Sequence, residues 1–133
     1  MIDITVSTEK ARVPVTVMHI DGNLDSGSYE AFRSKADELI QGGARYMLID
    51  LTHAPYVSSA GLRGLNSIFV RLRELTPDVS EEDMRKGINA GWYKSPHLKL
   101  LNPSQSSQVA LESSGFSMFI ESFTDLKTAL ASF

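Results

Sequence analysis

The sequence predicts a single α/β domain, spanning residues 1–133, in which strands and helices alternate along most of the chain. Apolar residues recur at every second position in two early segments and at helical spacing in several later ones. The length of 133 residues suits one domain, since a domain typically takes about 100–200 residues. Neither an internal repeat nor a linker divides the chain. This alternation favours a layered fold whose sheet is largely parallel toward its C-terminal side.

The chain begins with two predicted strands and a helix. Apolar and polar residues alternate over residues 2–6 and 13–20, as in half-buried strands. Helical spacing of the apolar residues then starts at Ser28, and either Ser26 or Ser28 caps the helix. The helix ends at Gly42, because glycine is favoured just past the last helical turn.

The central part predicts a buried strand followed by the most regular helix. Residues 46–51 are short and nearly all apolar, as in a strand buried on both faces. Residues 62–75 place their leucines, Ile68 and Phe69 on one helical stripe. The stretch 80–88 resembles a short helix that starts with a serine cap and acidic residues.

The last part continues the alternation with two strands and two helices. A strand is predicted at residues 97–101 and a helix at 104–113. The aromatic run 116–123 is typical of a short strand. A final helix follows, with Thr124 as its predicted cap.

Composition removes several classes of function. The chain has no cysteine, which excludes disulfides, a thiol nucleophile and thiolate metal sites, and which fits a reducing cytoplasm. The net charge is −3, so we expect neither nucleic acid nor an anionic membrane as a partner. The N-terminus lacks the basic and apolar regions of a signal peptide, and no apolar run reaches the roughly 20 residues of a spanning helix.

The patterns of common catalytic sites are missing as well. There is no glycine-rich phosphate loop, and His19, His53 and His97 lack the spacing of a metal site. Ser59 precedes an amphipathic helix, but a nucleophile elbow needs a small residue two positions earlier, where Val57 stands. A triad built on Ser59 would also need His97 as its base.

Carboxylates give no clearer catalytic pattern. Asp21 and Asp25 flank a turn and Asp50 ends a strand, all ordinary places for aspartate. We therefore expect no enzyme, no metal and no cofactor.

Ser58 and Ser59 follow the buried strand and open the amphipathic helix. One of them acts as the helix cap, which is worth about 1 kcal/mol. The other hydroxyl has no structural duty. A phosphoryl group there would meet free backbone N–H groups and the positive end of the helix dipole, and would add about −1.5 to −2 charges.

The stretch from Leu48 to Leu65 resembles the signature of STAS domains, the anti-sigma factor antagonist family. In that family an aliphatic strand ending in Asp-Leu leads to Asp-Ser-Ser/Ala-Gly-Leu at the start of a helix. Here Asp50-Leu51 and Ser59-Ala60-Gly61-Leu62 take those places. Gly22-Asn23-Leu24-Asp25 resembles the family's Gly-x-Leu-Asp, and residues 102–116 resemble its later strand, helix and glycine pattern.

The resemblance implies a cytoplasmic α/β domain with a mixed sheet and helices packed mainly on one side. It implies a bacterial regulator of transcription, not an enzyme, that binds a serine-kinase anti-sigma factor and so frees the sigma factor. By position, Ser59 is the phospho-acceptor; the kinase's phosphorylation of it abolishes binding, and a phosphatase restores binding. The partner would contact Asp25, Ser58, Ser59, Gly61 and Leu62. We expect a monomer.

Two departures from the family pattern leave alternatives open. Ser58 stands where the family usually has aspartate, so Ser58 is a rival acceptor to Ser59, and the modification itself is open. Residues 76–97 form an inserted segment in place of a short turn, and Trp92 and Tyr93 either anchor a partner or pack the insertion onto the domain. The alternative function is a STAS subunit without phosphorylation in a larger signalling or lipid-transport assembly.

Overall fold

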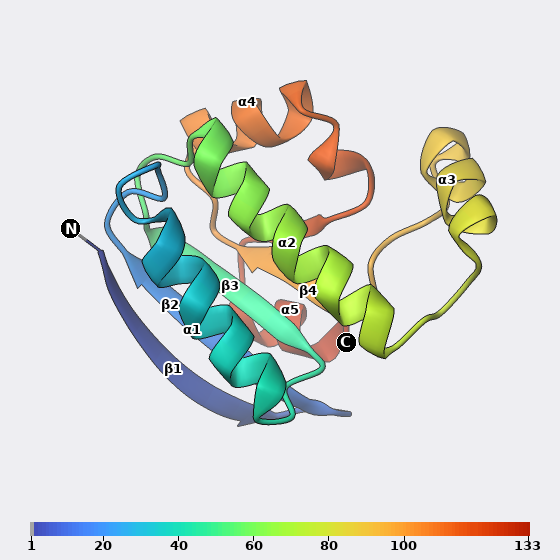
Figure 1. Cartoon of the computed structure of the whole chain (residues 1–133), viewed down its shortest axis with the longest axis horizontal. Coiled ribbons are helices and arrows are strands. Elements are labelled where there is room, and N and C mark those ends of the chain that lie inside the picture. Colours follow the sequence, from blue (N-terminus) through green and yellow to red (C-terminus); the bar gives the residue numbers. More distant parts are fainter. Residues whose placement is uncertain (1) are drawn as a thin grey trace.

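The computed structural model describes residues 2–133, and its strands and helices alternate along the chain (Figure 1). Met1, which the predicted domain includes, lies outside these residues. The strands are β1 (Asp3–Lys10), β2 (Pro14–Asp21), β3 (Met47–His53), β4 (Leu98–Leu101) and β5 (Glu121–Phe123). The helices are α1 (Tyr29–Gln41), α2 (Ser59–Leu75), α3 (Glu81–Ala90), α4 (Gln105–Ser113) and α5 (Leu126–Ala131), with a short 3-10 helix at Phe116–Met118.

The strands of the described chain form one sheet in the order β1-β2-β3-β4-β5. β1 and β2 pair antiparallel, and all other neighbours are parallel. Helices α1, α2 and α4 pack on one face, whereas α5 covers part of the other (Figure 1). The predicted α/β domain with a mixed sheet and helices mainly on one side is confirmed.

Side-chain alternation along the strands divides the core into two layers. Met18 and Ile20 of β2 lie in the larger layer, under α1 and α2. Val15 and Val17 of the same strand lie in the smaller layer, with α5. Leu48 of β3 joins the smaller layer while its neighbours join the larger one, so β3 is buried on both faces as its apolar run predicts.

The aromatic run 116–123 is not one strand, so that prediction was wrong. Phe116–Met118 forms a 3-10 turn, and only Glu121–Phe123 pairs with β4. The ring of Phe119 lies 4.9 Å from the ring of Phe69 in α2. Phe116 and Phe119 therefore pack half-buried against the larger core layer instead of extending the sheet.

Polar contacts fix both ends of α5. Asp125 caps the helix, because its Oδ2 accepts from the backbone N–H of Thr128 at 2.9 Å; the predicted cap, Thr124, was wrong. At the other end the buried Lys99 of β4 donates from Nζ to the carbonyl of Ser132 at 2.9 Å. Helix α5 is thereby held against β4 and β5, leaving the β1 side of that face uncovered by it.

Candidate docking site at the start of helix α2

Two loops lie side by side at the carboxyl ends of β2 and β3. Leu24 in the β2–α1 loop forms a parallel bridge with Val57 in the β3–α2 loop. The amide of Leu24 donates to the carbonyl of Tyr56 at 2.9 Å, and the amide of Ser58 donates to the carbonyl of Leu24 at 2.8 Å. The bridge places the loop that contains Asp25 next to the loop that leads into α2, so the predicted contact residues of both loops lie on one surface.

The two serines at the start of α2 have different surroundings. Ser58 is the cap residue: its backbone is extended, and its Oγ accepts from the amide of Gly61 at 3.3 Å. Ser59 is the first helical residue, is exposed, and its hydroxyl has no hydrogen-bond partner within residues 2–133. One hydroxyl therefore serves the helix, and the other faces solvent beside the free amides of the first turn.

Gly61 allows the two loops to approach each other closely. It is buried, and a Cβ atom on it would lie 2.6 Å from the carbonyl oxygen of Leu24. Gly61 therefore lies beneath the surface of the candidate site and supports the two loops from below. Leu62 is half-buried and packs against the larger core layer.

Asp25 organises the turn that leads into α1. Its Oδ1 accepts from the amides of Gly27 at 3.0 Å and Ser28 at 3.2 Å. The buried Ser28 in turn donates from Oγ to the carbonyl of Asn23 at 2.6 Å. Asp25 remains half-buried at the edge of an open hollow of about 440 Å³ that Pro55 also lines, so it is both a structural residue and part of the surface.

Sequence reasoning missed the contribution of α4 to this surface. Ser104 and Ser106, at the start of α4, donate to the carbonyl of Pro55 at 2.9 and 3.1 Å. Next to Pro55, the side chain of Tyr56 is 50% exposed. A tyrosine close before a serine pair was a signal in the sequence for a contact surface, and Tyr56 stands there. The approach of α4 left no such signal, because it depends on the packing of segments distant in the chain.

The triad considered for Ser59 does not form. His97 lies just before β4, at the amino ends of the parallel strands, whereas Ser59 lies at their carboxyl ends. The Nδ1 of His97 donates to the carbonyl of Arg45 at 2.8 Å, and its ring stacks 4.8 Å from that of Tyr46. His97 is therefore a structural residue far from α2's first turn.

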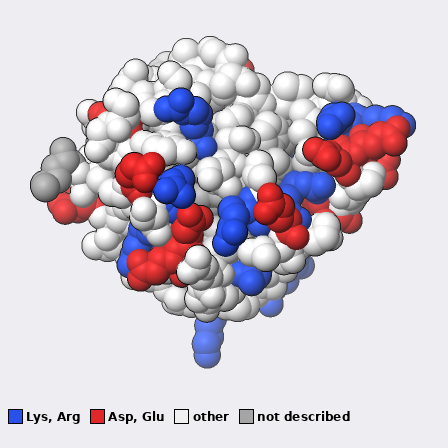
Figure 2. Space-filling view, in the orientation of Figure 1, with Lys and Arg blue, Asp and Glu red and all other residues white. Residues whose placement is uncertain are grey.

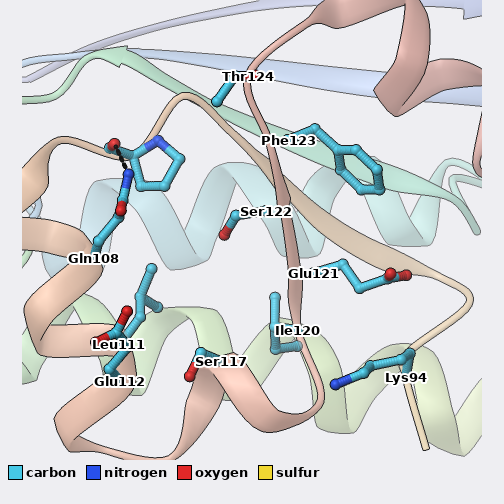
Figure 3. A pocket seen from close by; sticks show the side chains of 11 residues that line it. Lys94, Gln108, Leu111, Glu112, Ser117, Ile120, Glu121, Ser122, Phe123 and Thr124 are labelled. Carbon is cyan, nitrogen blue, oxygen red and sulfur yellow. Dashed lines mark hydrogen bonds between the residues drawn. The ribbon is translucent and has the colours of Figure 1, made fainter. Parts of the chain in front are cut away.

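Away from the serine pair, the described surface carries no cluster of metal ligands. Within residues 2–133, no group of three or more potential ligand side chains could hold a metal ion, and no helix is long and apolar enough to cross a bilayer. A hollow of about 410 Å³ lies between α4 and β5, lined by Leu111, Ile120 and Phe123 among others, away from the serine pair (Figure 3). On the face that carries α1 and α2, acidic and basic side chains are interspersed (Figure 2).

Comparison with known proteins assigns the family. The family model of the STAS domain matches residues 6–77, more than half of the chain. The chain belongs to the STAS domain family. The matched region of this STAS domain contains both loops of the candidate site and ends at the start of the segment 76–97. No curated protein sequence matches the chain.

Solved structures share the fold of this STAS domain along most of its length. An anti-sigma factor antagonist from Mycobacterium paratuberculosis has a TM-score of 0.72 at 14% identity, over 99% of this chain and 93% of that chain. A putative anti-sigma factor antagonist from Thermotoga maritima has a TM-score of 0.66 at 13% identity, over 86% and 83%. The Bacillus cell fate determinant SpoIIAA, in its phosphorylated form, has a TM-score of 0.62 at 16% identity, over 96% of each chain.

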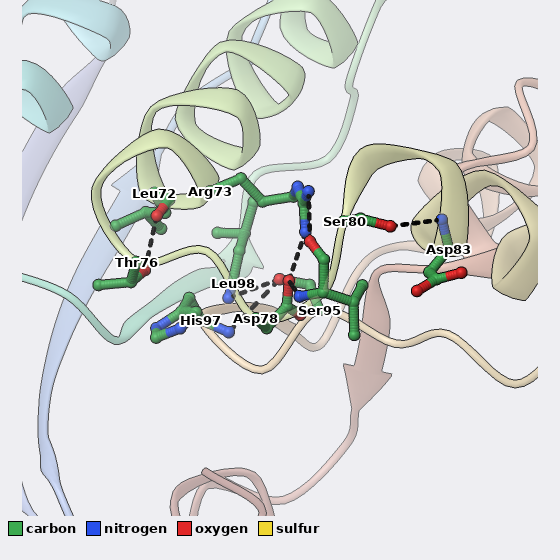
Figure 4. A network of polar contacts seen from close by, with 10 residues as sticks. Leu72, Arg73, Thr76, Asp78, Ser80, Asp83, Ser95, His97 and Leu98 are labelled. Carbon is green, nitrogen blue, oxygen red and sulfur yellow. Dashed lines mark hydrogen bonds and ion pairs between the residues drawn. The ribbon is translucent and has the colours of Figure 1, made fainter.

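The segment 76–97 of this STAS domain folds into α3 between two loops, beside the C-terminal end of α2 (Figure 1). Arg73 of α2 pairs with Asp78 and so ties the first loop down (Figure 4). Tyr93 is buried in the larger core layer, and burial, together with the nearby Asp78, raises the pKa of Tyr93 to about 12. Trp92 is 58% exposed. Tyr93 thus packs the segment onto the domain, whereas a partner role for Trp92 stays a prediction.

Proposed function

We propose that this STAS domain is a bacterial, cytoplasmic anti-sigma factor antagonist. It binds a serine-kinase anti-sigma factor through the start of α2 and the Asp25 loop, which frees a sigma factor and so regulates transcription. Phosphorylation of Ser59 by the kinase ends the binding, and a phosphatase restores it. In this docking role the domain acts as a monomeric binding module and not as an enzyme.

The state of the Ser59 hydroxyl carries this proposal. It is exposed and unbonded among the described residues, while the neighbouring Ser58 already caps the helix. A phosphoryl group on Ser59 would displace no internal hydrogen bond, and it would lie near the positive end of the helix dipole. Modification of Ser58 would instead remove the cap, so we favour Ser59 over its rival.

The same geometry explains how a phosphoryl group would act as a switch. The modification adds about −1.5 to −2 charges to a surface that a partner must desolvate. An unpaired charge in an interface costs about 3–5 kcal/mol, and each 1.4 kcal/mol is a factor of ten in affinity. Phosphorylation would therefore weaken binding by a factor between about 10² and about 4 × 10³ without refolding the domain.

The first experiment locates the modification. The purified protein is incubated with ATP and the serine-kinase anti-sigma factor of its own organism, and the product is measured by intact mass and peptide mapping. We expect one phosphoryl group on Ser59, none on the Ser59→Ala variant, and continued phosphorylation of the control Ser58→Ala. Absence of any phosphoryl group, or its placement on Ser58, contradicts the proposal.

The second experiment separates the two functions left open by the sequence. Binding of the kinase is measured for the unmodified protein, for Ser59→Asp and for the control Ser122→Asp, which changes an exposed serine in the edge strand β5. Loss of affinity in Ser59→Asp alone supports a phosphorylation-controlled antagonist. Unchanged affinity favours the alternative, a STAS subunit of a larger signalling or lipid-transport assembly, for which the replacement of the family's usual aspartate by Ser58 is the supporting observation.

A further inference from the structure

Three polar side chains from three neighbouring strands form a line on the sheet face opposite α1 and α2. They are Ser7 of β1, His19 of β2 and Asp50 of β3. By strand alternation, His19 shares a face with Val17, and Asp50 shares that face with Leu48. Helix α5 packs against β4 and β5, so the line lies on the side of this face that the helix leaves uncovered.

The hydrogen bonds along the line have the order of a nucleophile, a base and an orienting acid. The Nδ1 of His19 lies 2.7 Å from Oδ2 of Asp50, and its Nε2 lies 3.0 Å from Oγ of Ser7. Because an ionised carboxylate only accepts hydrogen bonds, Nδ1 carries the hydrogen. In the neutral imidazole, Nε2 is then the acceptor for the proton of the Ser7 hydroxyl, as in serine nucleophiles activated by histidine.

Asp50 is held in the orientation that this line needs. Its Oδ1 accepts from the amide of Thr52 at 3.0 Å and from the Thr52 hydroxyl at 2.5 Å, which leaves Oδ2 for His19. Burial by itself raises the pKa of Asp50, but the hydrogen bonds from Thr52 and His19 outweigh it and lower the pKa overall. The carboxylate is therefore ionised at neutral pH and fixes the imidazole tautomer.

A small hollow opens onto the histidine and the acid of this line. It has a volume of about 300 Å³ and is lined by Thr5, His19, Ile20 and His53 together with the carboxylates of Asp3, Asp21 and Asp50. Ser7 lies beside the hollow, because its Oγ is 3.0 Å from Nε2 of His19. The side chain of His19 is 37% exposed there. The volume suits a small acyl group, and three carboxylates repel an anion, so the hollow favours a neutral or cationic molecule.

We propose that Ser7 is a nucleophile that His19 activates and that takes the acyl group of a small neutral or cationic carboxylic ester. The Oγ of Ser7 bonds to the ester carbonyl carbon, and its proton moves to Nε2 of His19. The ester C–O bond then breaks, and His19 returns the proton to the departing alcohol. Water repeats the sequence on acyl-Ser7 and releases the carboxylic acid. This activity is independent of the docking function proposed for α2.

The site offers little stabilisation to the oxyanion that forms on the carbonyl. Strand N–H groups point along the sheet toward neighbouring strands and not out of its face. The hydroxyl of Thr5, which pairs with His19 in the sheet register and lines the hollow, is the donor on this face that we assign to the oxyanion. We therefore expect slow turnover, with acyl-Ser7 accumulating when the leaving group is good.

The test uses p-nitrophenyl acetate, a neutral ester with a good leaving group. Release of p-nitrophenolate is followed in time, and the quenched protein is analysed by intact mass and peptide mapping. We expect a burst that approaches one acetyl group per protein, placed on Ser7. Ser7→Ala abolishes the burst, and His19→Gln slows it about 100-fold or more. The matched control is Ser122→Ala, which changes an exposed serine in the other edge strand of the same sheet and leaves the burst unchanged.

Asp50 is a positioning residue, and its role has its own readout. Asp50→Asn slows acetylation of Ser7, whereas Asp50→Glu restores part of the rate because a carboxylate again accepts from Nδ1. Thermal unfolding of each variant shows whether the fold is retained. The proposal is overturned if folded wild-type protein acquires no acetyl group on Ser7, or if acetylation is equally fast in His19→Gln.

Discussion

Helices α1 and α2 both begin with serines at the same edge of the sheet, yet these serines have opposite surroundings. Ser28, before α1, is 4% exposed; its Oγ donates to the carbonyl of Asn23 and accepts from the amide of Asp25 at 3.0 Å. Ser58, before α2, accepts one hydrogen bond, from the amide of Gly61. The hydroxyl of the exposed Ser59 has no hydrogen-bond partner within the described chain. The α1 turn uses its polar groups to hold itself together, whereas the α2 turn keeps one hydroxyl available.

This difference separates stability from function along one surface. Changes at the α1 turn must remove or crowd internal hydrogen bonds and so act on folding. Changes at Ser59 alter only the outer surface, which is what a reversible modification requires. The following substitutions test this contrast.

Introducing a carboxylate gives the largest expected contrast. Ser28→Asp places a charge in a buried site whose nearest acid, Asp25 Oδ1, lies 3.3 Å from the present hydroxyl, and we expect a loss of about 3–5 kcal/mol of unfolding free energy. Ser59→Asp places the same charge at an exposed helix start, where we expect a gain of about 0.3–1 kcal/mol. Urea denaturation measures both, and a large loss in Ser59→Asp would contradict the contrast.

A methyl group at the loop contact comes next in size. Gly61→Ala brings Cβ to 2.6 Å from the carbonyl oxygen of Leu24, and we expect a loss of about 1–3 kcal/mol as the loops separate. In the control Gly27→Ala, Cβ meets only Asp25 Oδ1 at 3.4 Å, so the change stays within about 0.5 kcal/mol. Equal melting temperatures for the two variants would show that the close approach does not matter.

Removing the hydroxyls of Ser28 and Ser58, which both make hydrogen bonds, compares how much each contributes to the free energy of unfolding. Ser28→Ala removes a buried hydroxyl that bonds the carbonyl of Asn23 and the amide of Asp25, and is expected to cost about 1–3 kcal/mol. Ser58→Ala removes only a helix cap and is expected to cost about 1 kcal/mol. The reverse order, measured by urea denaturation, would mean that the α2 cap is the stronger of the two.

The smallest change in stability is expected at Ser59, the serine without a hydrogen-bond partner. Ser59→Ala removes a hydroxyl with no partner, so the free energy of unfolding changes by less than about 0.5 kcal/mol. The same variant loses phosphorylation completely under our proposed function. A stability loss as large as that of Ser58→Ala would reveal a structural role for Ser59.

Much of the site was predictable because its signals are local in the sequence. The buried strand, the serine pair and the amphipathic stripe predict a helix start with one capping and one free hydroxyl. They do not say which serine caps the helix, since residues 58 and 59 are both serine and either could take the cap position. The backbone before α2 decides this: Ser58 is extended with φ −86° and ψ 178°, while Ser59 is already helical.

The line of Ser7, His19 and Asp50 was not predictable in the same way. In the sequence, His19 lies within the predicted strand 13–20, Asp50 ends another strand and Ser7 follows the predicted strand 2–6. The base considered for a serine nucleophile was His97, and the serine was Ser59. Strand order and register bring the three side chains together across β1, β2 and β3. Nothing in the spacing of residues 7, 19 and 50 encodes that register.

The sequence by itself determined the order of strands and helices and the family, because both depend on periodicity and on motifs within short stretches of chain. The tertiary structure decided which hydroxyls are free, which glycine must stay small and which histidine meets a carboxylate. Those outcomes depend on contacts between segments that are distant in the chain, where a shift of one residue moves a side chain to the other face of the sheet.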